Sequence, residues 1–308
     1  PTMTPSDRAQ QRFLFITGKG GVGKTTVTAA LALKLAAEGK RVLIGICDAK
    51  ERISSLLGVP SIGEDIASVG QNVWAVKITA EKAMQEYGLM ILKSRTAYKA
   101  VFDNRYTRGF FKGVPGLQEW SMLGKAWYHS IEELPSGQQR FDVVLFDAPA
   151  TGHGLDMLRV PKVITEVVPP GILRRDAERA WSMFQDPKQS GVVVVTLPED
   201  MPTNETIELF EALESELKLP VARLVINGVI DELFSETERE TLLGDHDLDR
   251  SKPGDEAISG GVRRAIRERV QADSLVRLEQ LKADRVRLPL LMKDAQTPEA
   301  IRELSELL

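Results

Sequence analysis

A glycine-rich segment between an apolar run and a helix-forming segment constrains this 308-residue chain more than any other feature. Residues 17–26 read Thr-Gly-Lys-Gly-Gly-Val-Gly-Lys-Thr-Thr and directly follow an apolar run at residues 13–17. Residues 26–38 are rich in Ala and Leu, contain no Gly or Pro, and are followed by Gly39, which is typical of a helix with a glycine C-cap. The sequence therefore predicts a buried strand, a tight loop and a helix in succession.

The predicted loop has the chemistry of a phosphate-binding site. The pattern G-x-x-x-x-G-K-[ST] is satisfied by Gly18, Gly23, Lys24 and Thr25. Its glycines let consecutive backbone N–H groups point at phosphate oxygens, and the following helix adds the positive end of its dipole. We expect Lys24 to reach the β- and γ-phosphates of a nucleotide and Thr25 to ligate Mg²⁺. The nucleotide-binding residues expected in the loop are Gly18, Gly20, Gly21, Val22, Gly23, Lys24, Thr25 and Thr26. The alternative interpretation is a glycine turn with an incidental lysine.

A second lysine, Lys19, lies in the same loop and is not required by the pattern. Its position near the start of the loop makes it unsuited to the phosphates that Lys24 serves. It could instead extend toward a nucleotide held by a facing subunit, as an arginine finger does in trans. The alternative is a solvated surface lysine, which charge and position alone do not exclude.

Two aspartates follow predicted strands at the edge of the sheet where the phosphates are expected. Asp147 ends the apolar residues 143–146, so its carboxylate is suited to hold Mg²⁺ through water. Asp48 follows the strand predicted at residues 42–46, and an acid there could orient the water that attacks the γ-phosphate. Each has a structural alternative, a helix cap or turn for Asp147 and a strand-end turn for Asp48.

Apolar runs alternate with helical stretches along the chain. Beyond the runs at residues 13–17, 42–46 and 143–146, further strands are predicted at residues 73–78, 192–197 and 223–226. This alternation predicts an α/β fold with a doubly wound, mostly parallel sheet. Several runs are apolar throughout, as expected for strands that helices cover on both faces.

The domain organisation follows from the same reading. Residues 10–308 are predicted to form one domain, with a helical subdomain inserted at residues 80–135, where no strand signal occurs. Residues 231–285 are predicted to be helical, with a loop around residues 245–261, where Asp, Ser, Gly and Pro collect.

Composition excludes several classes of function. A formal net charge of −4 argues against a surface built for nonspecific nucleic-acid binding, so no nucleic acid is expected. No apolar run approaches the roughly 20 residues that span a bilayer, and the polar start lacks the apolar part of a signal peptide, so we expect no integral membrane segment and a cytoplasmic location. With one cysteine and three histidines, any catalytic metal is expected to be bound by oxygen.

The motifs together resemble a known family. Residues 19–25, Lys-Gly-Gly-Val-Gly-Lys-Thr, resemble the deviant Walker A motif of partition and cell-division ATPases, nitrogenase iron protein, and the arsenite-pump and tail-anchored-protein-targeting ATPases. Residues 147–153, Asp-Ala-Pro-Ala-Thr-Gly-His, resemble switch II of the last two, the ArsA-like, anion-transporting branch. His153 keeps the spacing of that branch, although a lone histidine is more often a structural hydrogen-bonding group. The resemblance implies a P-loop NTPase fold, ATP hydrolysis, and ATP and Mg²⁺ as cofactors.

The resemblance also implies a dimer and a catalytic set. The first lysine of this class contacts nucleotide across a dimer, so Lys19, Lys24 and Asp48 are the expected catalytic residues. The dimer is expected to be a homodimer or a heterodimer with a paralogous ATPase. Residues 48–51 read Asp-Ala-Lys-Glu where the family has Asp-Pro-Ala-His. The water-orienting role expected of Asp48 depends less on the missing proline and histidine than does the coupling of this segment, switch I of the family, to a partner.

Adenine recognition is implied in two later segments. Asn227 stands where family members read the adenine edge, whereas an Asn at a strand end is otherwise an ordinary turn former. Pro289 and Leu290 belong to Leu-Pro-Leu-Leu at residues 288–291, which resembles the loop beside adenine.

The cysteine count separates the branches of the family. One cysteine, Cys47, supplies neither the thiolates that As(III) needs nor a zinc or iron–sulfur site. The helical insertion could form a groove for a hydrophobic or membrane-protein client, or its apolar residues could pack on the sheet. The residues concerned are Met84, Leu89, Met90, Ile91, Phe102, Phe110, Phe111, Met122 and Leu123.

Three functions remain open. The first is an ATPase that opens and closes a dimer to handle a partner or client. The second is a partition- or division-type ATPase acting on DNA or a membrane surface, although the amphipathic residues 298–308 carry three glutamates and one arginine, a poor match to anionic lipid. The third is a nucleotide-dependent scaffold with little hydrolysis, which the altered residues after Asp48 allow.

Overall fold

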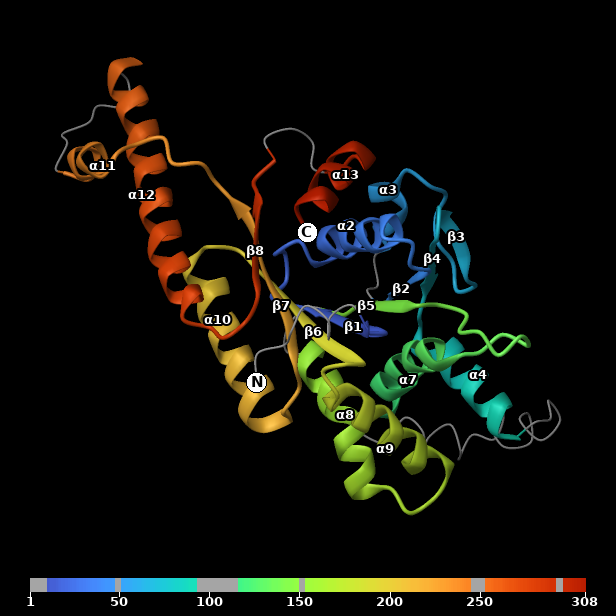
Figure 1. Ribbon diagram of the computed structural model, residues 1–308. Coiled ribbons are helices and arrows are strands. Elements are labelled where there is room, and N and C mark those ends of the chain that lie inside the picture. Colours follow the sequence, from blue (N-terminus) through green and yellow to red (C-terminus); the bar gives the residue numbers. More distant parts are fainter. Residues whose placement is uncertain (1–9, 48–50, 93–115, 150–152, 245–252, 292–295) are drawn as a thin grey trace.

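The computed structural model describes residues 10–47, 51–92, 116–149, 153–244, 253–291 and 296–308. Within these residues an eight-stranded sheet has the order β3-β4-β2-β5-β1-β6-β7-β8 (Figure 1). All neighbouring strands are parallel except β3 and β4. The strands are β1 (Phe13–Thr17), β2 (Val42–Ile46), β3 (Ala67–Gly70), β4 (Val73–Lys77), β5 (Val143–Asp147), β6 (Ser190–Thr196), β7 (Val221–Val229) and β8 (Arg285–Pro289). The expected α/β fold with a mostly parallel sheet is confirmed.

Helices cover both faces of this sheet (Figure 1). One face carries α2 (Lys24–Ala37), α3 (Ile53–Leu57) and α13 (Pro298–Leu307). The other carries α7 (Leu117–Ile131), α8 (His153–Val167), α9 (Ile172–Gln185) and α10 (Asp200–Glu211), which continues into the π-helix η1 (Ala212–Leu217). Alternate residues of β1 pack on opposite faces of the sheet, because Phe13 and Phe15 belong to one hydrophobic core while Leu14 and Ile16 belong to the other. This double burial explains why the central strands are apolar throughout.

Two strands were missed by the sequence pattern, and both lie at the edges of the sheet. β3 is a short, largely exposed run that pairs antiparallel with β4 through an irregular register. β8 alternates arginines with apolar residues and has only β7 beside it. Edge strands are covered on fewer sides, so they lack the continuous apolar signal of central strands.

Two helices are described within residues 80–135, where a helical subdomain was predicted. α4 (Ala80–Leu92) packs on α7, and residues 93–115, which include Phe102, Phe110 and Phe111, lie outside the described residues. Leu123 is 0% exposed and Met122 packs against the core. These two side chains therefore pack on the sheet domain rather than line a client groove. Met90 is 45% exposed and remains available at the surface.

An arm formed by α11 (Glu236–Leu243) and α12 (Pro253–Glu279) projects from the β7–β8 end of the sheet (Figure 1). The prediction of a loop around residues 245–261 is wrong for residues 253–261, because α12 already begins at Pro253. Proline is favoured in the first helical turn, and Asp255 and Glu256 complement the helix dipole there. A Cβ at Gly261 would lie 3.3 Å from Leu242 Cδ2, so glycine lets α11 approach α12 closely.

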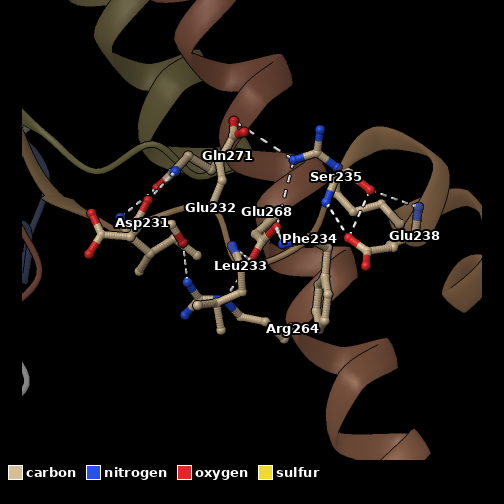
Figure 2. A network of polar contacts seen from close by, with 11 residues as sticks. Asp231, Glu232, Leu233, Phe234, Ser235, Glu238, Arg264, Glu268 and Gln271 are labelled. Carbon is tan, nitrogen blue, oxygen red and sulfur yellow. Dashed lines mark hydrogen bonds and ion pairs between the residues drawn. The ribbon is translucent and has the colours of Figure 1, made fainter.

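A buried polar network fixes the base of this arm (Figure 2). The Glu268 carboxylate on α12 accepts hydrogen bonds from the Leu233 N–H (2.9 Å), the Phe234 N–H (3.4 Å) and Arg264 Nε (2.8 Å). Arg239 Nη1 of α11 adds an ion pair at 3.6 Å. Burial on its own raises the pKa of Glu268, but the hydrogen bonds from Arg264 and the two backbone N–H groups outweigh it and lower the pKa. The connection from β7 to α11 is thereby held along α12.

Candidate functional site

The glycine loop lies between β1, in the middle of the sheet, and α2. Gly18 has φ +149°, and a Cβ there would lie 2.1 Å from Val195 O of β6. Gly23 has φ +92°, and a Cβ there would lie 2.3 Å from Asn227 Nδ2 of β7. Both positions therefore require glycine, because the backbone conformation and the neighbouring atoms exclude a side chain. The loop is seated on the carboxyl ends of β6 and β7.

The N-terminus of α2 opens onto this loop. Its N-cap residue, Gly23, provides no side-chain cap, so the first-turn N–H groups are oriented for an anion. Lys24, the first residue of α2, donates from Nζ to Gly18 O and Lys19 O at 3.1 Å each. Its ammonium group therefore lies over the loop. The structure brings the predicted phosphate-binding groups together, with Thr26 in the same first turn.

The two predicted magnesium ligands are in direct contact. Thr25 Oγ1 donates to Asp147 Oδ2 at 2.9 Å, and Asp147 is 1% exposed at the end of β5. Thr28 Oγ1 lies 3.3 Å from Asp147 Oδ1 and 2.9 Å from Lys24 O. Hydroxyl and carboxylate oxygens are ligands that Mg²⁺ prefers, and phosphate and water commonly complete its shell. The residues fit a magnesium ion bound with nucleotide.

Thr28 is a site residue that the motif did not reveal. It stands three positions after Thr25 on α2, and residues three apart share a helix face. That spacing was the available signal. Among the described residues, no group of three or more His, Cys, Asp or Glu side chains could hold a metal ion.

Lys19 forms an ion pair within the chain. Its Nζ lies 2.7 Å from Glu205 Oε1 of α10, with the two side chains 26% and 37% exposed. No local signal in the sequence pointed to the pair, because the two residues are 186 positions apart.

The residues expected beside adenine lie on β7 and at the end of β8, with Leu290 directly after it. Asn227 is inside β7 rather than at its end, and its Nδ2 donates to Val22 O at 2.9 Å. Pro289 ends β8, which corrects the expectation that it lies in a loop, and the Leu290 N–H donates to Val229 O at 2.8 Å. The strand pairing places Asn227 and Leu290 at the same edge of the sheet, while Asn227 also supports the phosphate loop.

Two sequence-based assignments have no described side-chain geometry. Asp48 lies outside the described residues, although β2, which precedes it, ends with Ile46 in register with Asp147. His153 begins α8, but the position of its side chain lies outside what the structure describes.

Within the described residues, no helix is long and apolar enough to cross a membrane.

Comparison with known proteins agrees with this site. The model of the anion-transporting ATPase family matches residues 11–170 and 173–246, which include the glycine loop, Asp147 and Asn227. ATPase BagA of Mycobacterium tuberculosis is 28% identical over 323 aligned residues, covering 98% of this chain and 94% of that protein. The arsenical pump-driving ATPases of Acidiphilium multivorum and Escherichia coli are 27% and 26% identical over 75% of this chain, which spans only 41% of each.

The matched region covers well over half of the chain and contains the loop, the aspartate and the strands that position them. The resemblance inferred from residues 19–25 and 147–153 is therefore confirmed at the level of the family. The chain belongs to the anion-transporting ATPase family and is an ATPase.

Proposed function

We propose that this ATPase works as a dimeric molecular switch, which opens and closes with Mg²⁺ and ATP to handle a partner or a hydrophobic or membrane-protein client. The contact of 2.9 Å between Thr25 Oγ1 and Asp147 Oδ2 beside the glycine loop carries the proposal. It joins the helix that binds phosphate to the strand that leads into residues 148–153, so a ligand at this point would act on both segments. Such a joint is what a nucleotide-dependent switch requires.

Each site residue has a role in hydrolysis under this proposal. The loop N–H groups and Lys24 bind the phosphates and stabilise the charge that develops on the transferred group. Thr25 and Asp147 hold Mg²⁺, which supplies further neutralisation of phosphate charge when bound. Asp48 orients the attacking water, and Lys19 contacts the nucleotide of the facing subunit.

The decisive experiment compares Lys19→Ala with the wild type. We expect Lys19→Ala to bind nucleotide normally but to lose ATP-driven dimerisation and hydrolysis, because the facing site then lacks its cation. Nucleotide titration, sedimentation and phosphate release measure the three properties. Lys34→Ala, a change in the last turn of α2, the helix that follows the loop, is the matched control. A Lys19→Ala variant that is monomeric and fully active would refute the dimeric switch.

A cavity in the helical insertion supports the client part of the proposal. It has a volume of about 240 Å³ and lies between α4 and α7, with Tyr87, Met90, Trp120 and Tyr128 in its lining. Met90 and Tyr128 are 45% and 43% exposed, so an apolar segment could reach them. Aromatic and methionine side chains are typical of surfaces that accept varied apolar partners.

Client handling is tested by trapping the ATP state with Asp48→Asn in the native cell and identifying the proteins that copurify. We expect a specific protein, and we expect Met90→Glu in the trapped variant to remove it. Val276→Glu, at an apolar position of α12 that is 59% exposed, is the matched control. Recovery of no specific protein would count against client handling, and ATP-dependent binding to DNA or liposomes would favour a positioning ATPase instead.

A further inference from the structure

The two lysines of the glycine loop have different partners within one subunit. Lys24 Nζ donates to the loop carbonyls of Gly18 and Lys19 at 3.1 Å each. Lys19 Nζ instead contacts the carboxylate of Glu205, on α10, at 2.7 Å. The main chain of Lys19 is thus tied to the phosphate-binding lysine, while its side chain is tied to another helix.

The helix that carries Glu205 is itself well anchored. α10 follows β6, the neighbour of β1, and its Leu209 and Phe210 belong to the buried core. Asn204, the residue before Glu205, accepts a hydrogen bond from Arg277 of α12, which lies beside α10 (Figure 1). Glu205 is therefore presented to Lys19 by a fixed element rather than by a loop.

We propose that Glu205 is a positioning residue for Lys19, an intramolecular latch that holds the ammonium group in its own subunit until the phosphates of a facing nucleotide displace the carboxylate. This inference rests on the proposed function, because it needs a dimer in which Lys19 changes partner. It assigns to α10 a role in setting when that dimer forms.

The chemistry of the pair suits such an exchange. Lysine carries a compact charge with three N–H donors on a flexible stem, so it can leave a carboxylate for a phosphate without a fixed bidentate geometry. A terminal phosphate carries more negative charge than a carboxylate and attracts the ammonium more strongly at equal distance. The pair is also partly exposed, and pairs of this kind are individually weak. Lys19 is therefore held, but reversibly.

A symmetric dimer must open two of these latches when it closes. Removing the carboxylate charge of Glu205 leaves Lys19 available beforehand, so the dimer should form at a lower protein concentration. For two partly exposed pairs, we expect Glu205→Gln to lower the concentration for half-maximal dimerisation by about three- to tenfold. Binding of nucleotide to the monomer should be unchanged, because Lys24, Thr25 and Asp147 are untouched.

The test measures dimerisation of full-length protein by sedimentation over a range of concentrations with Mg²⁺ and a nonhydrolysable ATP analogue. Glu208→Gln is the matched control, because Glu208 is exposed on the same helix. Glu205→Gln is also placed in the Lys19→Ala background, where no ATP-driven dimer is expected, and its thermal unfolding there is compared with that of Lys19→Ala alone. Thermal unfolding of each variant reports a purely structural effect, which would not depend on Lys19.

The outcomes are distinct. A lower midpoint in Glu205→Gln than in the wild type and in Glu208→Gln, with no effect of Glu205→Gln on thermal unfolding in the Lys19→Ala background, supports the latch. If the wild type dimerises with ATP and the midpoint of Glu205→Gln is the same as or higher than that of the wild type, the latch is overturned. The dimeric switch is then left intact. Absence of an ATP-dependent dimer in the wild type and in both glutamate variants overturns the dimeric switch and the latch together.

Discussion

The glycine loop and the base of the α11–α12 arm both pair a carboxylate with cations, but they do so in opposite ways. In the loop region, Lys19 and Glu205 form an ion pair at 2.7 Å, with side chains 26% and 37% exposed. In the arm, Glu268 has a side chain that is 0% exposed, and it accepts from Arg264 and two backbone N–H groups. One carboxylate has a partner that solvent and other anions can reach, whereas the other is enclosed.

The difference shows how burial decides what an ion pair can do. A partly exposed pair contributes little to stability, so its lysine can change partner at small cost. A buried carboxylate with several donors is expensive to expose, because each unpaired donor loses its hydrogen bond without gaining water. We therefore expect changes in the loop to alter activity and changes at the base of the arm to alter stability.

The largest expected effect separates the two regions at once. Lys24→Ala should reduce ATP hydrolysis by at least about 100-fold, because it removes a cation from the phosphates. The free energy of unfolding should change by only about 1 kcal/mol, since the ammonium group of this half-buried lysine donates to the loop carbonyls of Gly18 and Lys19. Phosphate release and chemical denaturation measure the two quantities. A strongly destabilised variant would break the comparison.

Glu268→Ala should show the reverse pattern. It leaves Arg264, Leu233 and Phe234 without their acceptor, so we expect the free energy of unfolding to fall by about 3 kcal/mol. Hydrolysis per folded molecule should remain close to that of the wild type. The matched control is Glu279→Ala on the same helix, whose ion pair with Arg287 is 50% exposed on each side. Equal destabilisation by the two variants in chemical denaturation would contradict the account of the network.

The smallest expected effect concerns pH. The pKa of Glu268 is below its ordinary value of 4.5 in the folded protein, so its stabilising contribution is complete above that value and is lost as pH falls through the folded pKa. The stability advantage of the wild type over Glu268→Gln should therefore shrink on acidification, because glutamine does not titrate. Denaturation of both proteins from about pH 7 to about pH 3.5 measures it. An advantage that is constant over this range would count against the network.

The sequence predicted the parts of the fold and site whose signals are local. The six central runs were recognisable because both faces of these strands are buried, and Lys24, Thr25 and the glycines stand in one continuous motif. Asp147 was found from its place at the end of an apolar strand. β3 and β8 were missed because they are edge strands, and the start of α12 was misplaced because Gly and Pro dominated the local pattern.

Partnerships between distant residues had no such signal. Glu205 lies 186 positions from Lys19, and Glu268 lies 35 positions from Leu233. Nothing in the residues around either glutamate predicts the partner that it contacts. Only the packing of α10 beside the loop, and of α12 along the β7–α11 connection, selects them.

By itself the sequence determined the phosphate loop, the family and the α/β fold, because backbone conformation, helix capping and strand burial depend on neighbouring residues. The tertiary structure decided which acidic side chains contact the residues of these elements. It placed Asp147 in contact with Thr25, paired Lys19 with Glu205 of the same chain, and buried Glu268. The physical reason is that the strength and reversibility of a charge pair depend on burial and on the number of donors, and both arise only when distant segments pack together.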